Sequence, residues 1–336
     1  MLKKIFSLLL ILAICFSFSS CGKKQSNFSK TIFNYFDTVT TVSGYFDSQE
    51  EFNKCFEKIE NKLEFYHKLF DIYNSYDGIN NIKSINENSG VTPVVVDEKI
   101  IELLLFSKDM YNKTAHTVNV CAGPIISLWK NSLEKGKLPM QRDINKTKEL
   151  IDFNNLLIND EDNTVYLKKK GCSIDVGAVA KGFVCEDIKE FLNSVGFKKG
   201  IINIGGNVLI VGEKGEKESF KVGIKNPFGS GNLYNVLVND KSVVTSGDYE
   251  RFYEIDGKRY NHIINTNTLS PSSLNKSVTI ICNNSALADA LSTALFIMDY
   301  TEGIKLIDSI ENCEALIIDE KGAEYFSSNF EKYLQK

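Results

Sequence analysis

The sequence lacks the features that would assign a function at a glance. It has no block of like charges, no low-complexity tract and no internal repeat, and its formal net charge is −4. This balance gives no electrostatic footprint for nucleic acid, so we expect no nucleic-acid partner. None of the eight cysteines forms a Cys-x-x-Cys pair, and we expect no metal site built on sulfur.

Long hydrophobic runs are also missing, with one exception at the start of the chain. Two lysines precede a nearly continuous apolar run from Ile5 to Phe18, which is too short to span a bilayer comfortably. A positive start followed by such a run is typical of a secretory signal. The run leads into Ser19-Ser20-Cys21, which resembles a bacterial lipobox.

This resemblance implies cleavage before Cys21 and acylation of that cysteine, so that lipid anchors the mature chain. The expected location is the extracytoplasmic face of the bacterial cell membrane. An ordinary cleaved signal and an uncleaved anchor are the alternatives, and both also place the folded part outside the cytoplasm. We therefore divide the chain into a signal at residues 1–20, a polar spacer at 21–30 and one folded domain at 31–336.

The composition, with 43% hydrophobic and 24% charged residues, indicates a soluble globular domain with a sizeable core. Six cysteines remain beyond the signal and the lipidation position. Each lies alone in an apolar neighbourhood, so we predict buried free thiols, although an even count in an exported protein leaves disulfides as the alternative. They are Cys55, Cys121, Cys172, Cys185, Cys282 and Cys313.

The spacing of apolar residues predicts both helices and strands. Apolar residues three and four apart predict helices at 52–70, 97–110, 183–195 and 286–296. Alternating or continuous apolar runs predict strands at 33–46, 164–168, 220–224 and 278–282, and strand pairs at 200–212 and 252–260.

One stretch, residues 173–183, combines a carboxylate, small residues and a lysine. Asp175 ends an apolar strand-like run, and Lys181 precedes Gly182 where a helix begins. Small residues let a ligand approach the backbone, and a helix N-terminus attracts anions. The order of lysine and glycine is not that of a P-loop. A buried strand that leads into an ordinary helix, with Asp175 as a cap, explains the same residues.

A second candidate is a carboxylate on the predicted helix 286–296. Asp289 and Thr293 are four residues apart, so they share one face, and apolar residues flank both. A carboxylate in such a place needs a partner, and Mg²⁺ would supply one. The alternative is that the helix dipole stabilises Asp289 and that Thr293 bonds to the backbone.

Five motifs follow one another in a distinctive order, and together they resemble those of the ApbE family of FAD:protein FMN transferases, commonly exported lipoproteins. The resemblance extends from about residue 33 to the C-terminus. The motifs are IDVGAVAKG at 174–182, NIGGN at 203–207, VTSGDYER at 244–251, YNHII at 260–264 and ADALSTA at 288–294.

The resemblance implies an α+β fold with mixed, mostly antiparallel sheets, flanking helices and a T-fold-like architecture, with FAD in a cleft between two lobes. The implied reaction is Mg²⁺-dependent transfer of FMN from FAD to a Thr or Ser hydroxyl of an acceptor flavoprotein, with release of AMP. The implied acceptors are subunits of membrane or exported redox complexes. In phosphoryl transfer, positioning and charge neutralisation supply most of the catalysis.

The matching motifs also imply roles for individual residues. Asp289, Thr293 and the backbone carbonyl of Ala178 would hold Mg²⁺, and Lys181 would place a catalytic positive charge near the phosphates. His262 would act as the general base, because imidazole titrates near working pH. The other residues implied for the flavin site are Tyr73, Asn119, Asp175, Gly205, Gly206, Thr245, Ser246, Gly247, Asp248 and Ile263.

Three positions depart from the family pattern. The family usually has Asp where Asn119 and Asn265 stand, and it often has Gly where Leu269 stands. Loss of the charge at Asn265 would weaken metal binding or make His262 less basic. A non-catalytic FAD-binding lipoprotein is therefore one alternative function. Another is an FAD diphosphatase, in which water replaces the hydroxyl acceptor and FMN and AMP are released.

Overall fold

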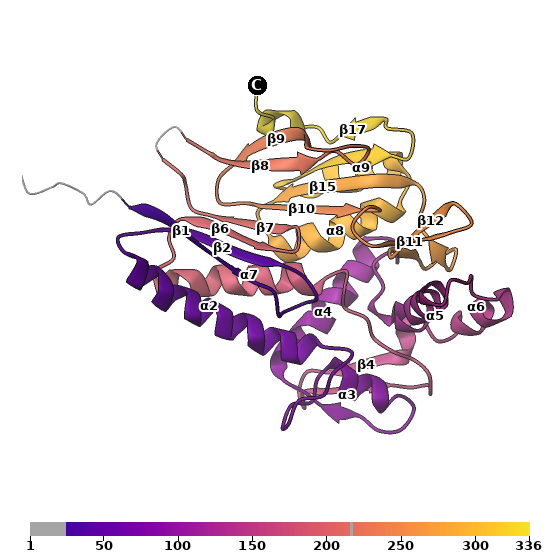
Figure 1. Ribbon diagram of the computed structural model, residues 1–336. Coiled ribbons are helices and arrows are strands. Elements are labelled where there is room, and N and C mark those ends of the chain that lie inside the picture. The colour runs from indigo at the N-terminus through magenta and orange to yellow at the C-terminus, as the bar shows by residue number, and fades with distance from the viewer. Residues whose placement is uncertain (1–24, 216–217) are drawn as a thin grey trace, which may run out of the picture.

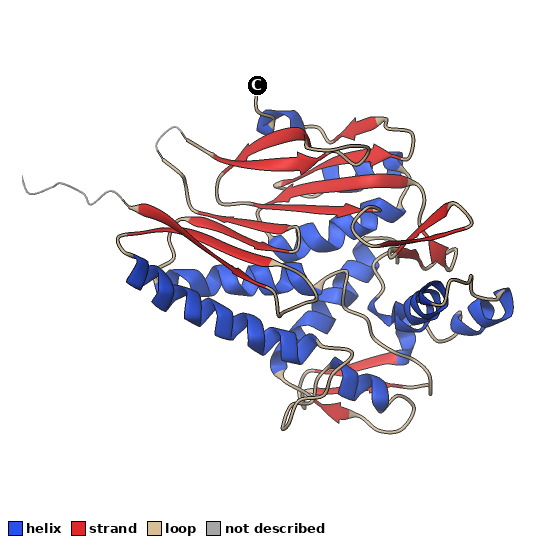
Figure 2. Cartoon of the chain, in the orientation of Figure 1, coloured by secondary structure: helices blue, strands red, loops and turns tan. Residues whose placement is uncertain are grey.

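An eight-stranded antiparallel sheet forms the centre of the protein (Figures 1 and 2). The computed structural model describes residues 25–215 and 218–336, so the expected signal and Cys21 lie outside the described residues. Strands that pair are often distant in sequence. In spatial order they are β1 (Ser26–Ile32), β2 (Thr40–Phe46), β6 (Gly200–Ile204), β7 (Asn207–Val211), β10 (Ser242–Gly247), β15 (Asn275–Cys282), β16 (Cys313–Asp319) and β17 (Glu324–Phe326).

Helices α2, α7 and α8 cover one face of this sheet (Figure 1). Several helices begin at a side chain that accepts a backbone N–H, such as Ser48 before α2 and Asn284 before α8, as helix N-termini require. The described helices are α2 (Gln49–Phe70), α3 (Ile82–Glu87), α4 (Glu98–Lys113), α5 (Gly123–Glu134), α6 (Gln141–Thr147), α7 (Ala180–Leu192), α8 (Ser285–Ile297) and α9 (Tyr300–Asp308), with 3₁₀ turns at Val120–Ala122, Phe153–Asn155, Asn193–Val195 and Phe330–Tyr333.

Both faces of the central strands are buried, because side chains alternate between the two faces. On β15, Ile280 packs in the main core with the helices. The next residue, Ile281, packs in a second core on the opposite face. A hairpin of β8 (Phe220–Lys225) and β9 (Asn232–Val238) contributes to that second core.

A third, smaller core holds α5 and α6 to two hairpins, β11 (Phe252–Ile255) with β12 (Lys258–Asn261), and β13 (Ile264–Asn265) with β14 (Ser270–Pro271). Its centre is Trp129 on α5, whose indole N–H donates to the Leu269 carbonyl at 2.8 Å. A separate small sheet has the order β3 (Val94–Val95), β5 (Thr164–Leu167) and β4 (Leu156–Asn159).

The mostly antiparallel sheets and flanking helices confirm the predicted α+β class. Two expected boundaries were wrong at the N-terminal end. Residues 26–30 of the expected spacer form part of β1, which pairs with β2. The strand expected at 33–46 begins only at Thr40, because Phe36 and Asp37 have positive φ angles and interrupt the extended chain.

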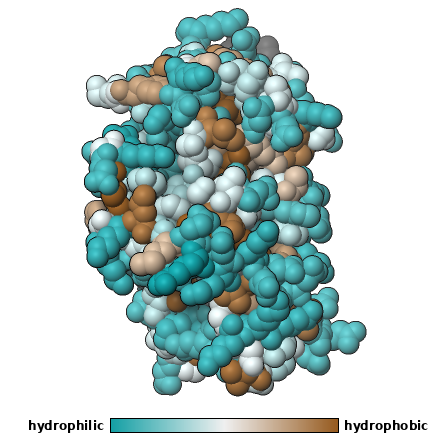
Figure 3. All heavy atoms as spheres, turned by 90° about the vertical axis from the view of Figure 1, so that its right-hand side faces the viewer, coloured by the Kyte–Doolittle hydropathy of each residue, from teal (hydrophilic) through white to brown (hydrophobic). Residues whose placement is uncertain are grey.

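The surface in Figure 3, which is the right-hand side of Figure 1, is mostly hydrophilic, with apolar side chains in separate patches. The exposed large apolar residues of the described chain include Leu138, Met140 and Phe252. Within residues 25–215 and 218–336, no helix combines the length and the apolar character needed to cross a membrane.

The prediction of free, buried cysteines was wrong for two of the six. Cys282 and Cys313 lie opposite each other on β15 and β16, 4.2 Å apart between their Cα atoms, and they form a disulfide. The two residues are 31 positions apart, and only the strand register brings them together. The other four cysteines are buried and free, as predicted: Cys55, Cys121, Cys172 and Cys185.

Replacement of both Cys282 and Cys313 by alanine should lower the free energy of unfolding by about 3 kcal/mol, since the cross-link closes a loop of about 30 residues in the unfolded chain. Urea unfolding of the oxidised proteins measures this difference. In a thiol reductant the difference should largely disappear. Free thiols at both positions in the unreduced protein, detected by alkylation and mass spectrometry, would contradict the pairing.

Candidate active site

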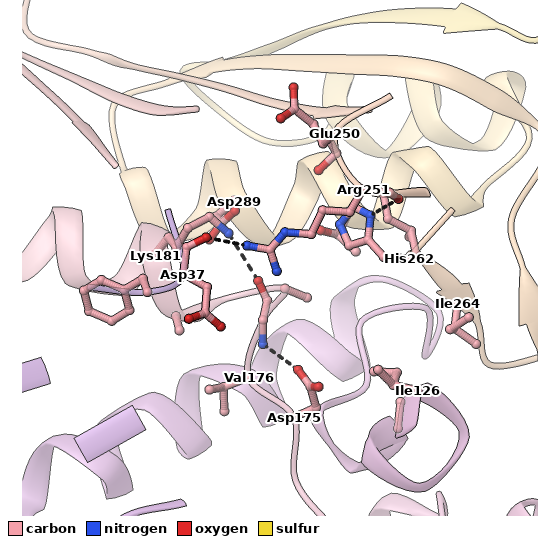
Figure 4. Close-up of a pocket in the computed structure, with 18 of the residues that line it drawn as sticks. Asp37, Ile126, Asp175, Val176, Lys181, Glu250, Arg251, His262, Ile264 and Asp289 are labelled. Atoms are coloured by element: carbon pink, nitrogen blue, oxygen red, sulfur yellow. Dashed lines mark hydrogen bonds between the residues drawn. The ribbon is translucent and has the colours of Figure 1, made fainter. Parts of the chain in front are cut away.

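A deep cleft of about 440 Å³ lies between the parts of the chain that carry the main core and the third core. Residues far apart in sequence meet around it, among them Asp175, Lys181, Arg251, His262 and Asp289 (Figure 4). The lining segments fall within residues 36–38, 67–74, 117–133, 175–181, 205–207, 245–253, 261–266 and 289–297.

The floor of the cleft is formed where the start of α7 meets α8. The Gly182 N–H donates to Asp289 Oδ2 at 2.8 Å. In a regular helix this N–H would bond to the Ala178 carbonyl four residues earlier. A Cβ on Gly182 would lie 2.4 Å from the Asp289 Cβ and 2.4 Å from the Ser285 carbonyl oxygen. Only glycine therefore permits this approach of the two helices.

Three residues with oxygen ligands line the cleft near this contact: Asp289, Ala178 and Thr293. Asp289 is only 4% exposed, and its Oδ1 accepts no hydrogen bond from the described residues. The Ala178 carbonyl and the Thr293 hydroxyl also line the cleft, and neither is hydrogen-bonded within the described part of the chain. A buried carboxylate oxygen without a donor needs a cation or water. This set of hard oxygen ligands fits Mg²⁺.

The described residues hold no cluster of three or more His, Cys, Asp or Glu side chains that would suit a metal ion. A cation in the cleft would therefore take one carboxylate, Asp289, together with the neutral oxygens of Ala178 and Thr293. Such a sparse protein ligand set is usual for Mg²⁺, which keeps several waters and often binds substrate phosphates as well.

Positive side chains approach the same space from other elements. Arg251, in the loop after β10, donates to the Asp37 carbonyl at 3.0 Å and so links two segments far apart in sequence. The Lys181 ammonium lies 3.4 Å from the Gly177 carbonyl. Burial raises the pKa of the Asp175 carboxyl, while the Gly177 N–H and the nearby Lys130, Lys181 and Arg251 act in the opposite direction. These cations suit an anionic ligand.

His262 follows β12 and lies beside Arg251 (Figure 4). Its Nδ1 is 3.2 Å from the Arg251 carbonyl oxygen. The His262 ring is exposed to solvent at the cleft surface. Desolvation by the surrounding protein lowers its pKa to about 4, and the positive charges of Arg251 and Lys181 add to this effect, whereas the hydrogen bond to the carbonyl opposes it. The imidazole is therefore neutral at neutral pH and can accept a proton.

Tyr73 lies at the mouth of the cleft, with 54% of its surface exposed. Asp71 fixes the loop, because its carboxylate accepts the Tyr73 and Asn74 N–H groups at 2.6 and 3.0 Å and the Tyr76 hydroxyl at 2.7 Å. The Lys130 ammonium donates to the Tyr73 hydroxyl at 3.0 Å from α5 on the opposite side. An exposed aromatic ring held in this way can stack on a planar ligand.

The structure brings most of the predicted site residues to this one cleft: Tyr73, Asn119, Asp175, Ala178, Lys181, Gly205, Thr245, Ser246, Gly247, His262, Ile263, Asp289 and Thr293. Gly206 and Asp248 are not among the lining residues. Asp248 is buried; its Oδ2 pairs with Lys276 on the neighbouring strand at 2.6 Å, whereas its Oδ1 has no hydrogen-bond partner among the described residues. The ligand-binding role expected for these two residues stays a prediction.

The departures from the family pattern have local structural consequences. Both polar groups of the Asn119 side chain are hydrogen-bonded: its NH₂ donates to the Ile151 carbonyl, and its oxygen accepts the Cys121 N–H. Asn265 accepts the Asn267 N–H at 2.9 Å within its own turn and does not line the cleft. Leu269 has a φ of +57°, a conformation that favours glycine.

Sequence reasoning missed several residues that line the cleft. Three of them lie inside the five motifs but were given no role: Asn207, Arg251 and Asn261. Their membership of a motif could have indicated that they line the cleft. Asp37 and Lys130 belong to no motif. They reach the cleft only because a loop and a helix fold over it, which no local pattern indicates.

Comparisons with known proteins agree with this geometry. Residues 36–317 match the ApbE family. A protein of Treponema pallidum named FAD:protein FMN transferase is 32% identical over 70% of this chain and 70% of its own length. One of Klebsiella pneumoniae with the same name is 29% identical over 70% of this chain and 74% of its own length.

The crystal structure of the ApbE protein from Thermotoga maritima superposes on 93% of this chain and 100% of its own chain, with a TM-score of 0.84 and 27% identity. This likeness confirms the predicted ApbE architecture. Since the family match extends over most of the sequence and the fold agrees with it, the chain belongs to the ApbE family.

Proposed function

We propose that this protein transfers FMN from FAD to a Thr or Ser hydroxyl of an acceptor flavoprotein, with Mg²⁺, and releases AMP. As a member of the ApbE family whose relatives are named FAD:protein FMN transferase, it is a transferase. One observation carries the finer proposal. A single cleft gathers oxygen donors for a cation, positive side chains for phosphates and a neutral imidazole.

In the proposed reaction the acceptor hydroxyl oxygen forms a bond to the phosphorus of the FMN half of FAD. The bond from that phosphorus to the bridging oxygen breaks, and AMP leaves with the electron pair. His262 accepts the hydroxyl proton, which its low pKa permits because the ring is unprotonated in the free protein.

Binding and orientation come from the other residues of the cleft. Lys181 and Arg251 hold the diphosphate by charge, and the Tyr73 ring stacks on the isoalloxazine. Gly205 and the 245–247 backbone line the cleft and leave room for the nucleotide. Asp289, Thr293 and the Ala178 carbonyl would hold Mg²⁺, which when bound neutralises charge on the diphosphate and on the leaving AMP.

The acceptors we propose are flavoprotein subunits of membrane or exported redox complexes. A lipid on Cys21 would hold the enzyme at the extracytoplasmic face of the bacterial cell membrane, close to such acceptors. This location rests on the lipobox-like sequence at the start of the chain.

Incubation of the purified protein with FAD, Mg²⁺ and an acceptor flavoprotein domain should give a fluorescent acceptor band after denaturing electrophoresis. The linkage is covalent, so the flavin should survive denaturation. A control acceptor with alanine in place of the hydroxyl residue should stay dark. AMP release without any acceptor would instead indicate an FAD diphosphatase, and bound FAD that stays intact would indicate a binding protein.

Asp289→Ala should lower Mg²⁺-dependent turnover by about 100-fold or more, the usual effect of losing a group that stabilises charge in the transition state. Turnover is measured as AMP release over a range of Mg²⁺ concentrations. Asp299→Ala, which removes a carboxylate cap from α9, serves as the matched control and should retain activity. Undiminished turnover in Asp289→Ala would remove Asp289 as a ligand.

The acidic limb of the kcat/KM profile should have its midpoint below the usual imidazole value of about 6.5, because desolvation by the protein and the charges of Arg251 and Lys181 lower the pKa of His262. Above this midpoint the free ring is neutral and can accept a proton; below it the protonated ring cannot. His262→Ala should abolish this limb and lower kcat by roughly 100-fold or more. His116→Gln, outside the cleft, should leave the profile unchanged. An acidic limb that persists unchanged in His262→Ala would contradict the assignment.

A further inference from the structure

Helices α7 and α8 face each other in a fixed register. The Ser285 N–H donates to Glu186 Oε2 at 2.6 Å. The Gly182 N–H donates to Asp289 Oδ2 at 2.8 Å. Gly182 lies four residues before Glu186 on α7, and its partner Asp289 lies four residues after Ser285 on α8. The two helices in contact are therefore antiparallel.

Ala178, in the turn just before α7, lies four residues before Gly182, and Thr293 on α8 lies four residues after Asp289. Together with Asp289, these two residues are the proposed cation ligands. The two hydrogen-bonded pairs are Glu186–Ser285 and Gly182–Asp289. Beyond them, Ala178 and Thr293 both line the cleft.

Each helix caps the other in this arrangement. Asp289 on α8 accepts an N–H in the first turn of α7, and Glu186 on α7 accepts the first N–H of α8. Such N–H groups have no partner inside their own helix, and carboxylates favour helix N-termini. Ser285 is fully buried, so its N–H would lose its partner if Glu186 were removed.

Glycine makes the register exclusive. A side chain at Gly182 would collide with both Asp289 and Ser285, the α8 members of the two hydrogen-bonded pairs. The two helices therefore approach each other closely at Gly182. Any slide of α8 along α7 would break both carboxylate bonds and change the spacing of Ala178, Asp289 and Thr293.

We propose that Glu186 is a positioning residue that fixes the register of α8 on α7 and thereby sets the spacing of the three cation ligands. Glu186 does not line the cleft, so it acts only through Ser285 and α8. This role rests on the proposed Mg²⁺ site. Glu186 lies outside that site but would influence how tightly the site binds Mg²⁺.

The test measures metal binding directly. Mn²⁺, which takes oxygen ligands as Mg²⁺ does, is titrated into the metal-free full-length protein, and the free ion is followed by its EPR signal. Glu186→Ala should weaken Mn²⁺ binding by roughly 10- to 100-fold, the range found when outer residues that orient metal ligands are lost. Glu186→Gln keeps an oxygen for the Ser285 N–H and should stay closer to the wild type.

Activity gives a second, separate readout. In Glu186→Ala the Mg²⁺ concentration needed for half-maximal turnover should rise by the same factor, whereas turnover at saturating Mg²⁺ should return close to the wild-type value. Asp289→Ala should not be rescued by Mg²⁺. This split separates a residue that orients ligands from a ligand itself.

Two controls keep the outcome clear. Asp97→Ala removes the carboxylate that caps α4 by accepting the Lys99 N–H at 2.8 Å, so it should lower the melting temperature without changing Mn²⁺ affinity. Ser285→Pro removes the Glu186 hydrogen bond from the other side, at the first helical position where proline is tolerated. It should weaken Mn²⁺ binding by a similar factor, and it serves if Glu186→Ala does not fold.

Wild-type Mn²⁺ affinity in both Glu186→Ala and Ser285→Pro, with loss of binding in Asp289→Ala, would overturn the role of Glu186 and leave the proposed function intact. A wild-type protein that binds no Mn²⁺ and transfers FMN without Mg²⁺ would overturn the metal site and this inference together.

Discussion

The close contact of α7 with α8 at Gly182 is the constraint on which the cleft depends. The two helices cover the same face of the central sheet, and their backbones meet where a side chain would not fit. This approach places a buried carboxylate, Asp289, at the start of α7, where the N–H groups of the first turn need acceptors. One contact thereby satisfies a helix terminus and orients a carboxylate toward the cleft.

The rest of the cleft is assembled from segments that the central sheet and the third core bring together. Arg251 follows β10 of the sheet and reaches the Asp37 carbonyl in the loop before β2. Lys130 lies on α5, in the part built around Trp129, and reaches Tyr73. Positive and negative side chains from these distant segments thereby line one cleft.

The features that could be predicted from the sequence are those encoded by residues close together in the chain. The helix 286–296, the strand pair at 200–212 and the glycine-rich start of α7 were predicted because periodicity and small residues lie within a few positions of one another. The five motifs likewise brought Asp289, Lys181 and His262 to one site, where the structure has them.

What could not be predicted arises from pairing between distant segments. The Cys282–Cys313 disulfide follows from the register of β15 with β16. Asp248 lies inside a motif, yet it pairs with Lys276 beside β10 rather than facing the cleft. Asp37 reaches the cleft only because the chain turns at positive φ before β2. Each outcome depends on contacts that hydrophobic periodicity along one segment does not encode.

The hydrogen bond from Gly182 to Asp289 Oδ2 also bears on the discrimination between ions of different size. With one oxygen committed to the backbone, the carboxylate can offer only Oδ1 to a cation. Ca²⁺ prefers six to eight oxygens and often takes both oxygens of a carboxylate, whereas Mg²⁺ accepts a single one and keeps its waters. A helix cap, which looks like a detail of folding, would thus favour the smaller ion at the proposed metal site.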